Sequence, residues 1–149
     1  MKYYIAGPMS GIPQFNYPLF DKVGAALIKA GHKTYNPSEM DDDETRAEAM
    51  ASETGILAGG TCNGESWGDF LSRDVKLIAD SDINAICLLP GWEKSRGARL
   101  EAFVAISLNY PAFEWIVDRP VKVQKDWILE RIKYGMMNPL SNEEKRYGG

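Results

Sequence analysis

Residues 82–108, DINAICLLPGWEKSRGARLEAFVAISL, predict a buried strand, a glycine-bearing loop and an amphipathic helix in succession. The apolar run 85–89 is short enough for a central parallel strand, and Pro90 and Gly91 end it. Gly97 lets the backbone turn tightly into the following helix. Because open α/β sheets bind ligands beyond the carboxyl ends of their strands, this loop marks the expected ligand site.

The helix in this stretch carries one acidic residue where an apolar one is expected. Its stripe of residues at i, i+4, i+7, i+8 and i+11 consists of Gly97, Glu101, Val104, Ala105 and Leu108. That stripe is otherwise the core-facing one, so Glu101 is predicted to point from the first turn toward the sheet. The alternative is that Glu101 lies at the edge of the stripe and reaches solvent.

A second helix, predicted over residues 66–80, repeats this pattern. Its apolar stripe of Trp67, Leu71, Val75 and Ile78 is interrupted by Asp74. A carboxylate facing a core is costly to ionise unless it is paired, hydrogen-bonded or open to a cleft. Salt bridges to Arg73 or Lys76 would be a purely structural explanation. Two such acids instead favour a carboxylate pair in a cleft, which is what nucleophilic or acid–base chemistry at a sugar carbon needs.

The rest of the chain predicts a single α/β domain with a mostly parallel sheet of four or five strands and helices on both faces. Further strands are expected at residues 2–6, 33–36 and 112–117, and further helices at 16–30, with Asn16 as cap, and 126–134, with Asp126 as cap. The acidic run 41–44 is interpreted as a solvated helix start, with a metal site as the weaker alternative.

Composition limits the classes of function. The chain has 149 residues, 44% hydrophobic and 26% charged, as in an ordinary globular protein of one domain. A net charge of −4 without a clustered basic face argues against nucleic acid as a partner. Apolar runs far short of a membrane span, and no signal-peptide pattern, predict a cytoplasmic protein without a membrane partner. One histidine and two cysteines, Cys62 and Cys87, predict neither a metal site nor a disulfide framework.

A glycine- and proline-bearing turn follows the first strand directly. Gly7, Pro8, Met9 and Ser10 form a loop of the kind that brings backbone N–H groups close to a ligand. The loop lacks the spacing of a dinucleotide-binding turn and the lysine of a P-loop. Many strand-to-helix turns are glycine-rich for steric reasons alone, so that explanation stays open. Trp92, just after the central strand, can stack on a base or pack in the core, and the pattern favours neither.

Three motifs together resemble the nucleoside 2-deoxyribosyltransferase superfamily. They are YIAGPMSG at residues 4–11, the pair Arg73-Asp74, and LLPGWEKSRGARLE at residues 88–101, and they are most similar to a small subgroup common in phage genomes. The superfamily also contains deoxynucleoside 5′-monophosphate N-glycosidases and cytidylate hydrolases. The resemblance covers residues 1–117 and implies a flavodoxin- or Rossmann-like domain there, followed by a C-terminal helix and tail over 118–149.

The resemblance also implies roles for individual residues. Glu101 matches the nucleophile that forms a glycosyl–enzyme intermediate, Asp74 the acid that assists proton transfer to the departing base, and Tyr4 the tyrosine that closes on glutamate and sugar. Ser95 matches a serine that holds the 5′-phosphate in the nucleotide hydrolases. The helix N-terminus at Gly97 is also suited to bind a 5′-phosphate or 5′-hydroxyl. The loop from Gly7 through Pro8 and Met9 to Ser10 matches the loop around the sugar and base.

Two positions depart from the nucleotide hydrolases, which have a serine where this chain has Pro8 and an arginine where it has Ser10. Arg96 and Arg99 are the expected substitutes for that positive charge.

The function expected is cleavage or transfer at the N-glycosidic bond of a (deoxy)nucleoside or its 5′-monophosphate, with no metal or organic cofactor required. The resemblance implies a homo-oligomer, a dimer or larger. The alternatives are a non-catalytic module that sequesters a nucleotide and a structural protein on the same scaffold.

Overall fold

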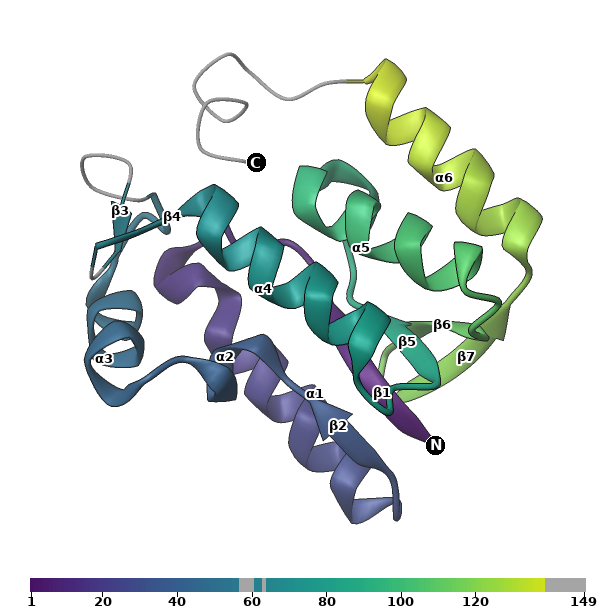
Figure 1. The fold of residues 1–149 in the computed structure, drawn as a ribbon, viewed down its shortest axis with the longest axis horizontal. Helices are drawn as coiled ribbons and strands as arrows, with labels where there is room; N and C mark the ends of the chain where they lie inside the picture. Colours follow the sequence, from purple (N-terminus) through teal and green to yellow (C-terminus); the bar gives the residue numbers. More distant parts are fainter. Residues whose placement is uncertain (57–60, 63, 139–149) are drawn as a thin grey trace.

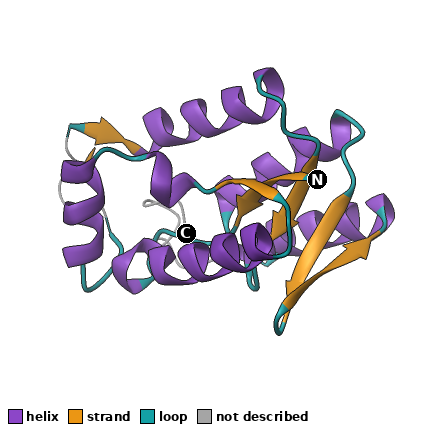
Figure 2. Ribbon diagram, turned by 90° about the horizontal axis from the view of Figure 1, so that it is seen from below, coloured by secondary structure: helices purple, strands orange, loops and turns teal. Residues whose placement is uncertain are grey.

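The computed structural model describes residues 1–56, 61–62 and 64–138, which form one five-stranded sheet with helices on both sides (Figures 1 and 2). The strand order is β2-β1-β5-β6-β7. The first four run parallel and β7 is antiparallel to β6. The predicted α/β class and mostly parallel sheet are therefore confirmed. The strands are β1 (Lys2–Ala6), β2 (Lys33–Tyr35), β5 (Ala85–Leu88), β6 (Ala112–Ile116) and β7 (Arg119–Val123).

Four long helices cover the sheet. They are α1 (Tyr17–Lys29), α4 (Trp67–Asp80), α5 (Arg96–Ser107) and α6 (Lys125–Met137). The shorter elements are η1 (Pro13–Asn16), α2 (Pro37–Met40), α3 (Asp43–Ala51), η3 (Trp92–Lys94) and an antiparallel ribbon of β3 (Thr61–Cys62) and β4 (Glu65–Ser66). In Figure 1, α3 and this ribbon lie at the left, away from β6 and β7.

The two central strands bury side chains on both faces. In β1, Tyr4 packs with α4, α5 and α6 on one face, whereas Ile5 packs with α1 on the other. In β5, Ile86 and Cys87 divide in the same way. Side chains alternate along a strand, so a strand covered on both faces reads as a continuous apolar run. This explains why the sequence predicts these two strands correctly.

Strand β7 was not expected from the sequence. The chain reverses at Val117, which has φ of 61°, and the Asp118 amide donates to the Ile116 carbonyl at 2.8 Å. Tight hairpin turns are usually recognised in a sequence by glycine or asparagine at the positions of positive φ, and this turn has neither residue. Pro120 also argues against a strand, but β7 lies at the edge of the sheet, where proline is tolerated.

Three local predictions were wrong. Asn16 has φ of 62° and does not cap α1; its amide donates instead to the Pro8 carbonyl at 2.9 Å. Helix α6 begins after Gln124, so Asp126 lies inside it and is not the cap. The inward stripe of α5 is rotated from the expected one, because Ala102 and Ile106 are buried and Leu108 is 41% exposed. Glu101 lies within the buried stripe in either frame.

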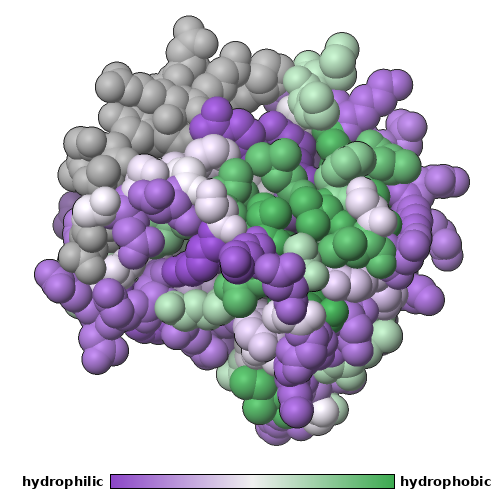
Figure 3. All heavy atoms as spheres, viewed as in Figure 1, coloured by the Kyte–Doolittle hydropathy of each residue, from purple (hydrophilic) through white to green (hydrophobic). Residues whose placement is uncertain are grey.

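The outer side of α5 carries exposed apolar side chains. Leu100, Phe103 and Leu108 are 45%, 52% and 41% exposed. Figure 3 shows a patch of hydrophobic residues on this face of the molecule, over α5. Among the residues that the structure describes, no helix combines the length and apolar character needed to cross a membrane.

Helix α6 packs so closely on η3 that one position requires glycine. A Cβ atom at Gly135 would lie 1.8 Å from the Glu93 carbonyl oxygen. The Arg131 guanidinium pairs with the Glu93 carboxylate at 3.1 Å, and Ile128 is fully buried against α5 and the sheet. Helix α6 therefore holds the segment that leads into the N-terminus of α5.

We expect Gly135→Ala to lower the free energy of unfolding by about 1–3 kcal/mol, because two backbones would have to separate. Gly68→Ala in α4 is the matched control. Its Cβ would meet only the Ser66 hydroxyl at 3.7 Å, so the variant should gain about 0.5–1 kcal/mol from helix propensity. Urea unfolding of both variants checks the contrast. Equal stability of the two would contradict the described packing of α6.

Candidate active site

A cavity of about 90 Å³ lies beyond the carboxyl ends of β1 and β5. Because β2 flanks β1 on one side and β5 flanks it on the other, this is the switch point of the sheet, where α/β proteins bind ligands. Seven of the expected site residues line the cavity: Gly7, Met9, Ser10, Asp74, Ser95, Gly97 and Glu101. The other lining residues are Phe15, Tyr17, Asp41, Ala49, Trp67, Phe70, Leu71, Arg73 and Ala98.

Glu101 is buried at the wall of this cavity. The residue is 6% exposed, so the alternative in which it reaches solvent is wrong. The Tyr4 hydroxyl, from β1, donates a hydrogen bond to Glu101 Oε2. Burial and then the Asp74 charge raise the pKa of Glu101 well above its ordinary value. Burial, followed by the charge on Glu101, also raises the pKa of Tyr4 well above the usual tyrosine value. The structure thus brings these three expected residues together.

Asp74 faces the same cavity from α4 and is 7% exposed. Arg73 donates from Nε to Asp74 Oδ1 at 3.0 Å, and its Nη2 lies 3.0 Å from the same oxygen. The salt bridge considered from the sequence therefore exists. Burial nevertheless raises the pKa of Asp74 to about 6, against the opposing charge of Arg73. The Asp74 charge raises the pKa of Glu101, and the two carboxyl groups share Arg73 and Tyr4 as neighbours, so they titrate as a pair.

Asp41 is a site residue that the sequence analysis did not identify. Its side chain is 2% exposed and accepts hydrogen bonds from Arg73 Nη1 and from the Tyr17 hydroxyl. The rest of the acidic run behaves as predicted, since Asp42 caps α3 by accepting from the Thr45 amide at 2.7 Å. Arg73 lies 32 positions further along the chain, so no local pattern could have revealed its pairing with Asp41.

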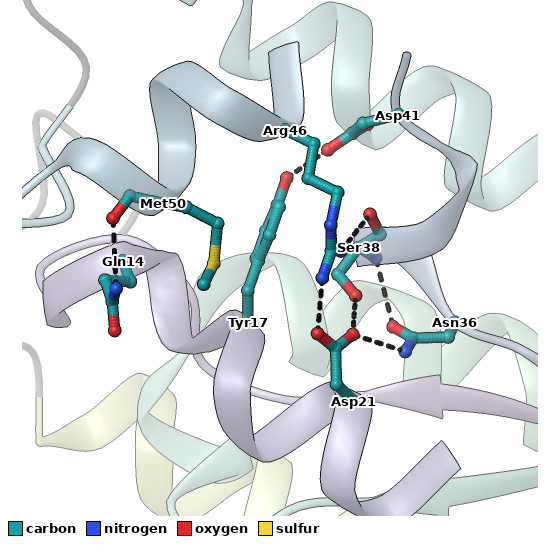
Figure 4. A network of polar contacts seen from close by, with 8 residues as sticks. All are labelled: Gln14, Tyr17, Asp21, Asn36, Ser38, Asp41, Arg46 and Met50. Carbon is teal, nitrogen blue, oxygen red and sulfur yellow. Dashed lines mark hydrogen bonds and ion pairs between the residues drawn. The ribbon is translucent and has the colours of Figure 1, made fainter. Parts of the chain in front are cut away.

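The segment that carries Asp41 is held by a polar network (Figure 4). Asp21, on α1, accepts from Arg46 Nη2 at 2.5 Å, from the Ser38 hydroxyl at 2.5 Å and from Asn36 Nδ2 at 3.2 Å. Arg46 also donates to the Ser38 carbonyl at 2.9 Å. The network joins α1 to α2 and α3, and it thereby fixes the wall of the cavity opposite α5.

The glycine-bearing turn after β1 has both a steric and a positional role. A Cβ atom at Gly7 would lie 2.7 Å from Leu89 Cβ, so the steric explanation holds at this position. Met9 and Ser10 nevertheless line the cavity. Pro8 is not among the described lining residues; its carbonyl instead accepts from the Asn16 side chain.

The N-terminus of α5 forms another wall. Ser95 is 6% exposed and caps the helix, since its hydroxyl oxygen accepts from the Ala98 amide at 3.2 Å. The Arg96 guanidinium lies 4.4 Å over the ring of Trp67, which lines the cavity. Arg99 instead donates to the Glu93 carbonyl at 2.9 Å, on the side of α6. Of the two arginines suggested by the sequence, Arg96 is the one beside the cavity.

Trp92 is placed in the core. It is 1% exposed, and its indole N–H donates to Glu114 at 3.0 Å. It is not among the described residues that line the cavity, so of the two explanations the structure supports packing. The aromatic side chains at the cavity are Phe15, Tyr17, Trp67 and Phe70. Sequence reasoning placed Trp67 on the apolar stripe of its helix but gave no sign that it faces a ligand site.

Among the described residues, no group of three or more His, Cys, Asp and Glu side chains is arranged to hold a metal ion. The site is thus a cavity at the carboxyl ends of two central strands, with two buried carboxyl groups. Glu101 accepts a hydrogen bond from Tyr4, and Asp74 accepts one from Arg73. The chain belongs to the family described as Domain of unknown function (DUF4406), whose sequence model matches residues 1–62 and 56–113. The matched segments include Tyr4, Asp74 and Glu101. None of the curated proteins compared with the chain matches it.

The raised pKa of Glu101 predicts a pH-dependent cost to stability. The Glu101 carboxyl loses its proton at lower pH in the unfolded chain than in the folded protein. Its contribution to the free energy of unfolding is therefore fully present below the ordinary glutamate pKa and is lost as pH rises through the raised pKa. Glu101→Gln keeps an acceptor for Tyr4 and cannot ionise. We expect it to melt with wild type near pH 4 and about 3 °C or more above it at pH 8.

Thermal unfolding across this pH range, with the exposed Glu130→Gln on α6 as the control for a charge change alone, tests this expectation. A Glu101→Gln variant that melts below wild type at pH 8 would contradict the described burial of a carboxyl group without a cationic partner.

Proposed function

We propose that this protein is an enzyme that cleaves or transfers at the N-glycosidic bond of a (deoxy)nucleoside or its 5′-monophosphate, with Glu101 as the nucleophile. The observation that carries the proposal is the pair of buried carboxyl groups, Glu101 and Asp74, at one cavity beyond the ends of β1 and β5. The three sequence motifs, all within the segments matched by the family, support a place in the nucleoside 2-deoxyribosyltransferase superfamily.

The chemistry of glycosidic cleavage suits Glu101. As the bond from sugar to base breaks, positive charge develops on the sugar, and a fixed carboxylate beside the anomeric carbon stabilises that charge. The same carboxylate can then bond to the anomeric carbon and form a glycosyl–enzyme intermediate. Tyr4 holds Glu101 Oε2, which leaves Oε1 as the oxygen for attack. Water or a second base completes the reaction, giving hydrolysis or transfer.

Asp74 suits the second task, protonation of the departing base. Its pKa of about 6, raised by burial, keeps a useful fraction of the carboxyl protonated near neutral pH. The two coupled carboxyl groups hold a proton together, since two charges in one buried site repel each other. Transfer of that proton to the base leaves Glu101 ionised when the sugar carries positive charge.

The remaining walls suit a nucleoside. Trp67 and Phe70 on α4 and Phe15 on η1 offer faces on which a planar base can stack. The hydroxyl of Ser95 and the N-terminus of α5 offer donors to a 5′-hydroxyl or 5′-phosphate. Arg96, over Trp67, adds positive charge on that side.

A chromatographic assay for free base tests the proposal, with ribo- and deoxyribonucleosides and their 5′-monophosphates, each with and without a second base. We expect base release by wild type. Glu101→Ala should lose at least about 10⁴-fold in kcat, Asp74→Asn about 10²–10⁴-fold and Tyr4→Phe roughly tenfold to 10²-fold.

The matched control is Asp80→Asn, at the exposed far end of α4, which should keep wild-type activity. If no base is released and a nucleotide binds wild type and Glu101→Ala equally well, the protein is the non-catalytic binding module instead. If no nucleoside or nucleotide binds at all, a structural role replaces both.

The positions of the two arginines predict how a 5′-phosphate would be recognised. Arg96→Ala should raise KM for a 5′-monophosphate about tenfold or more, the usual effect of losing a charge-assisted hydrogen bond, and leave KM for the nucleoside unchanged. Arg99→Ala, whose guanidinium lies on the side of α6, should change neither. Equal effects of both variants on both substrates would argue against a phosphate contact at Arg96.

The proposed enzyme is a homo-oligomer, a dimer or larger. The exposed apolar side chains of Leu100 and Phe103 on α5, and of Leu108 directly after it, support this part of the proposal, because large apolar patches on soluble proteins commonly mark interaction sites.

A further inference from the structure

One guanidinium lies between two carboxylates at the cavity. Arg73 donates from Nη1 to Asp41, while its Nε and Nη2 both face Asp74 Oδ1. Asp41 comes from the junction of α2 and α3, and Arg73 and Asp74 come from α4. Arg73 is therefore held at one end by a segment that is distant in sequence, and it holds Asp74 with the other.

Asp41 is built to stay in place. Its side chain is 2% exposed, and both of its oxygens are occupied, Oδ1 by Arg73 and Oδ2 by the Tyr17 hydroxyl. Figure 4 shows Tyr17 reaching Asp41 beside the Asp21–Arg46–Ser38 network that fixes the same segment. An ionised carboxylate this far buried needs such partners, since an unpaired one would be costly.

The arrangement divides the charge of Arg73. If Arg73 faced Asp74 alone, its full positive charge would favour the ionised form of that acid. Asp41 supplies a second negative charge next to Arg73, which offsets part of the effect of the cation on Asp74. Asp74 then keeps the geometry of an arginine-bound carboxyl while retaining its proton more readily.

We propose that Asp41 is a positioning residue that acts through Arg73, holding the Asp74 carboxyl in place and in its proton-bearing form for transfer to the leaving base. The inference rests on the proposed function and assigns a part in it to a residue outside the expected site. The charged and titratable groups that face Asp74 are Arg73 on its own helix, Asp41, Glu101 on α5 and Tyr4 on β1. Burial is the largest cause of the raised pKa of Asp74, and the Asp41 charge raises it further, against the effect of Arg73.

Asp41→Asn tests this role, because the amide keeps the shape and an acceptor for Arg73 Nη1 while it removes the charge. Its NH2 group also replaces the oxygen that accepts from the Tyr17 hydroxyl. We expect the alkaline limb of the pH–rate profile for base release to move about one pH unit toward acid. At pH 7 kcat should fall roughly tenfold, with KM unchanged. Asp41→Glu, which restores the charge on a longer side chain, should bring the limb back.

Asp21→Asn is the matched control. Asp21 also pairs with an arginine on the same wall, Arg46, but it is not among the described residues lining the cavity. It should leave the pH profile unchanged even where it lowers the melting temperature. If Asp41→Asn and Asp21→Asn reduce kcat alike without moving the limb, the role of Asp41 is structural and the proposal is overturned.

A second measurement separates this inference from the proposed function. In protein labelled with ¹³C at the aspartate carboxyl groups, the Asp74 signal, assigned with Asp74→Asn, can be titrated without any substrate. We expect Asp74 to titrate near 6 in wild type and about one unit lower in Asp41→Asn. If the wild-type protein releases no base, the proposed function is refuted, but the expected change in the Asp74 titration is not. An unmoved Asp74 titration would overturn the role of Asp41 even in an active enzyme.

Should Asp41→Asn not fold, the titration of Asp74 in Asp41→Ser, which also lacks the charge, decides. A fall of about one unit supports the charge role, and an unmoved value overturns it.

Discussion

The desolvation of two carboxyl groups at a single cavity is the constraint on which this structure depends. Glu101 and Asp74 are both almost fully buried, and burial is the main reason that their pKa values are raised. Such groups destabilise a fold unless neighbouring groups compensate them. A hydroxyl from β1 serves Glu101, and a guanidinium serves Asp74. The free-energy cost of burying both carboxyl groups must therefore be offset by packing elsewhere in the fold.

The sheet explains how these groups come together. The chain leaves β1 toward β2 on one side of the sheet and leaves β5 toward β6 on the other side. The two connections therefore diverge at the carboxyl ends of β1 and β5, where α/β sheets bind ligands. Helix α5 brings Glu101 in its first turns, directly over Tyr4 of the adjacent strand. The packing of α6 on η3, which requires glycine at Gly135, supports the entry to α5 from behind. Distant parts of the chain thus fix the positions of the Tyr4 and Glu101 side chains.

The wall opposite α5 is a separate layer of control. The segment of α2 and α3 is tied to α1 through Asp21 and reaches the site through Asp41. The Asp41 carboxylate is withdrawn from solvent, whereas Asp21 and Arg46 are each about one third exposed, so solvent screens the contact of Asp41 with Arg73 less than the contact of Asp21 with Arg46. In the proposed mechanism, an acid on α4 is therefore tuned by a counter-charge that the segment of α2 and α3 carries.

The α/β class, the two central strands and the helices that carry Asp74 and Glu101 could be predicted from the sequence, because these features follow from local apolar periodicity. It also indicated that both acids face inward, since each interrupts an apolar stripe. The sequence did not reveal that Trp92 packs in the core, that β7 extends the sheet, or that Asp41 reaches Arg73. Those facts depend on contacts between residues far apart in the chain, which periodicity cannot register.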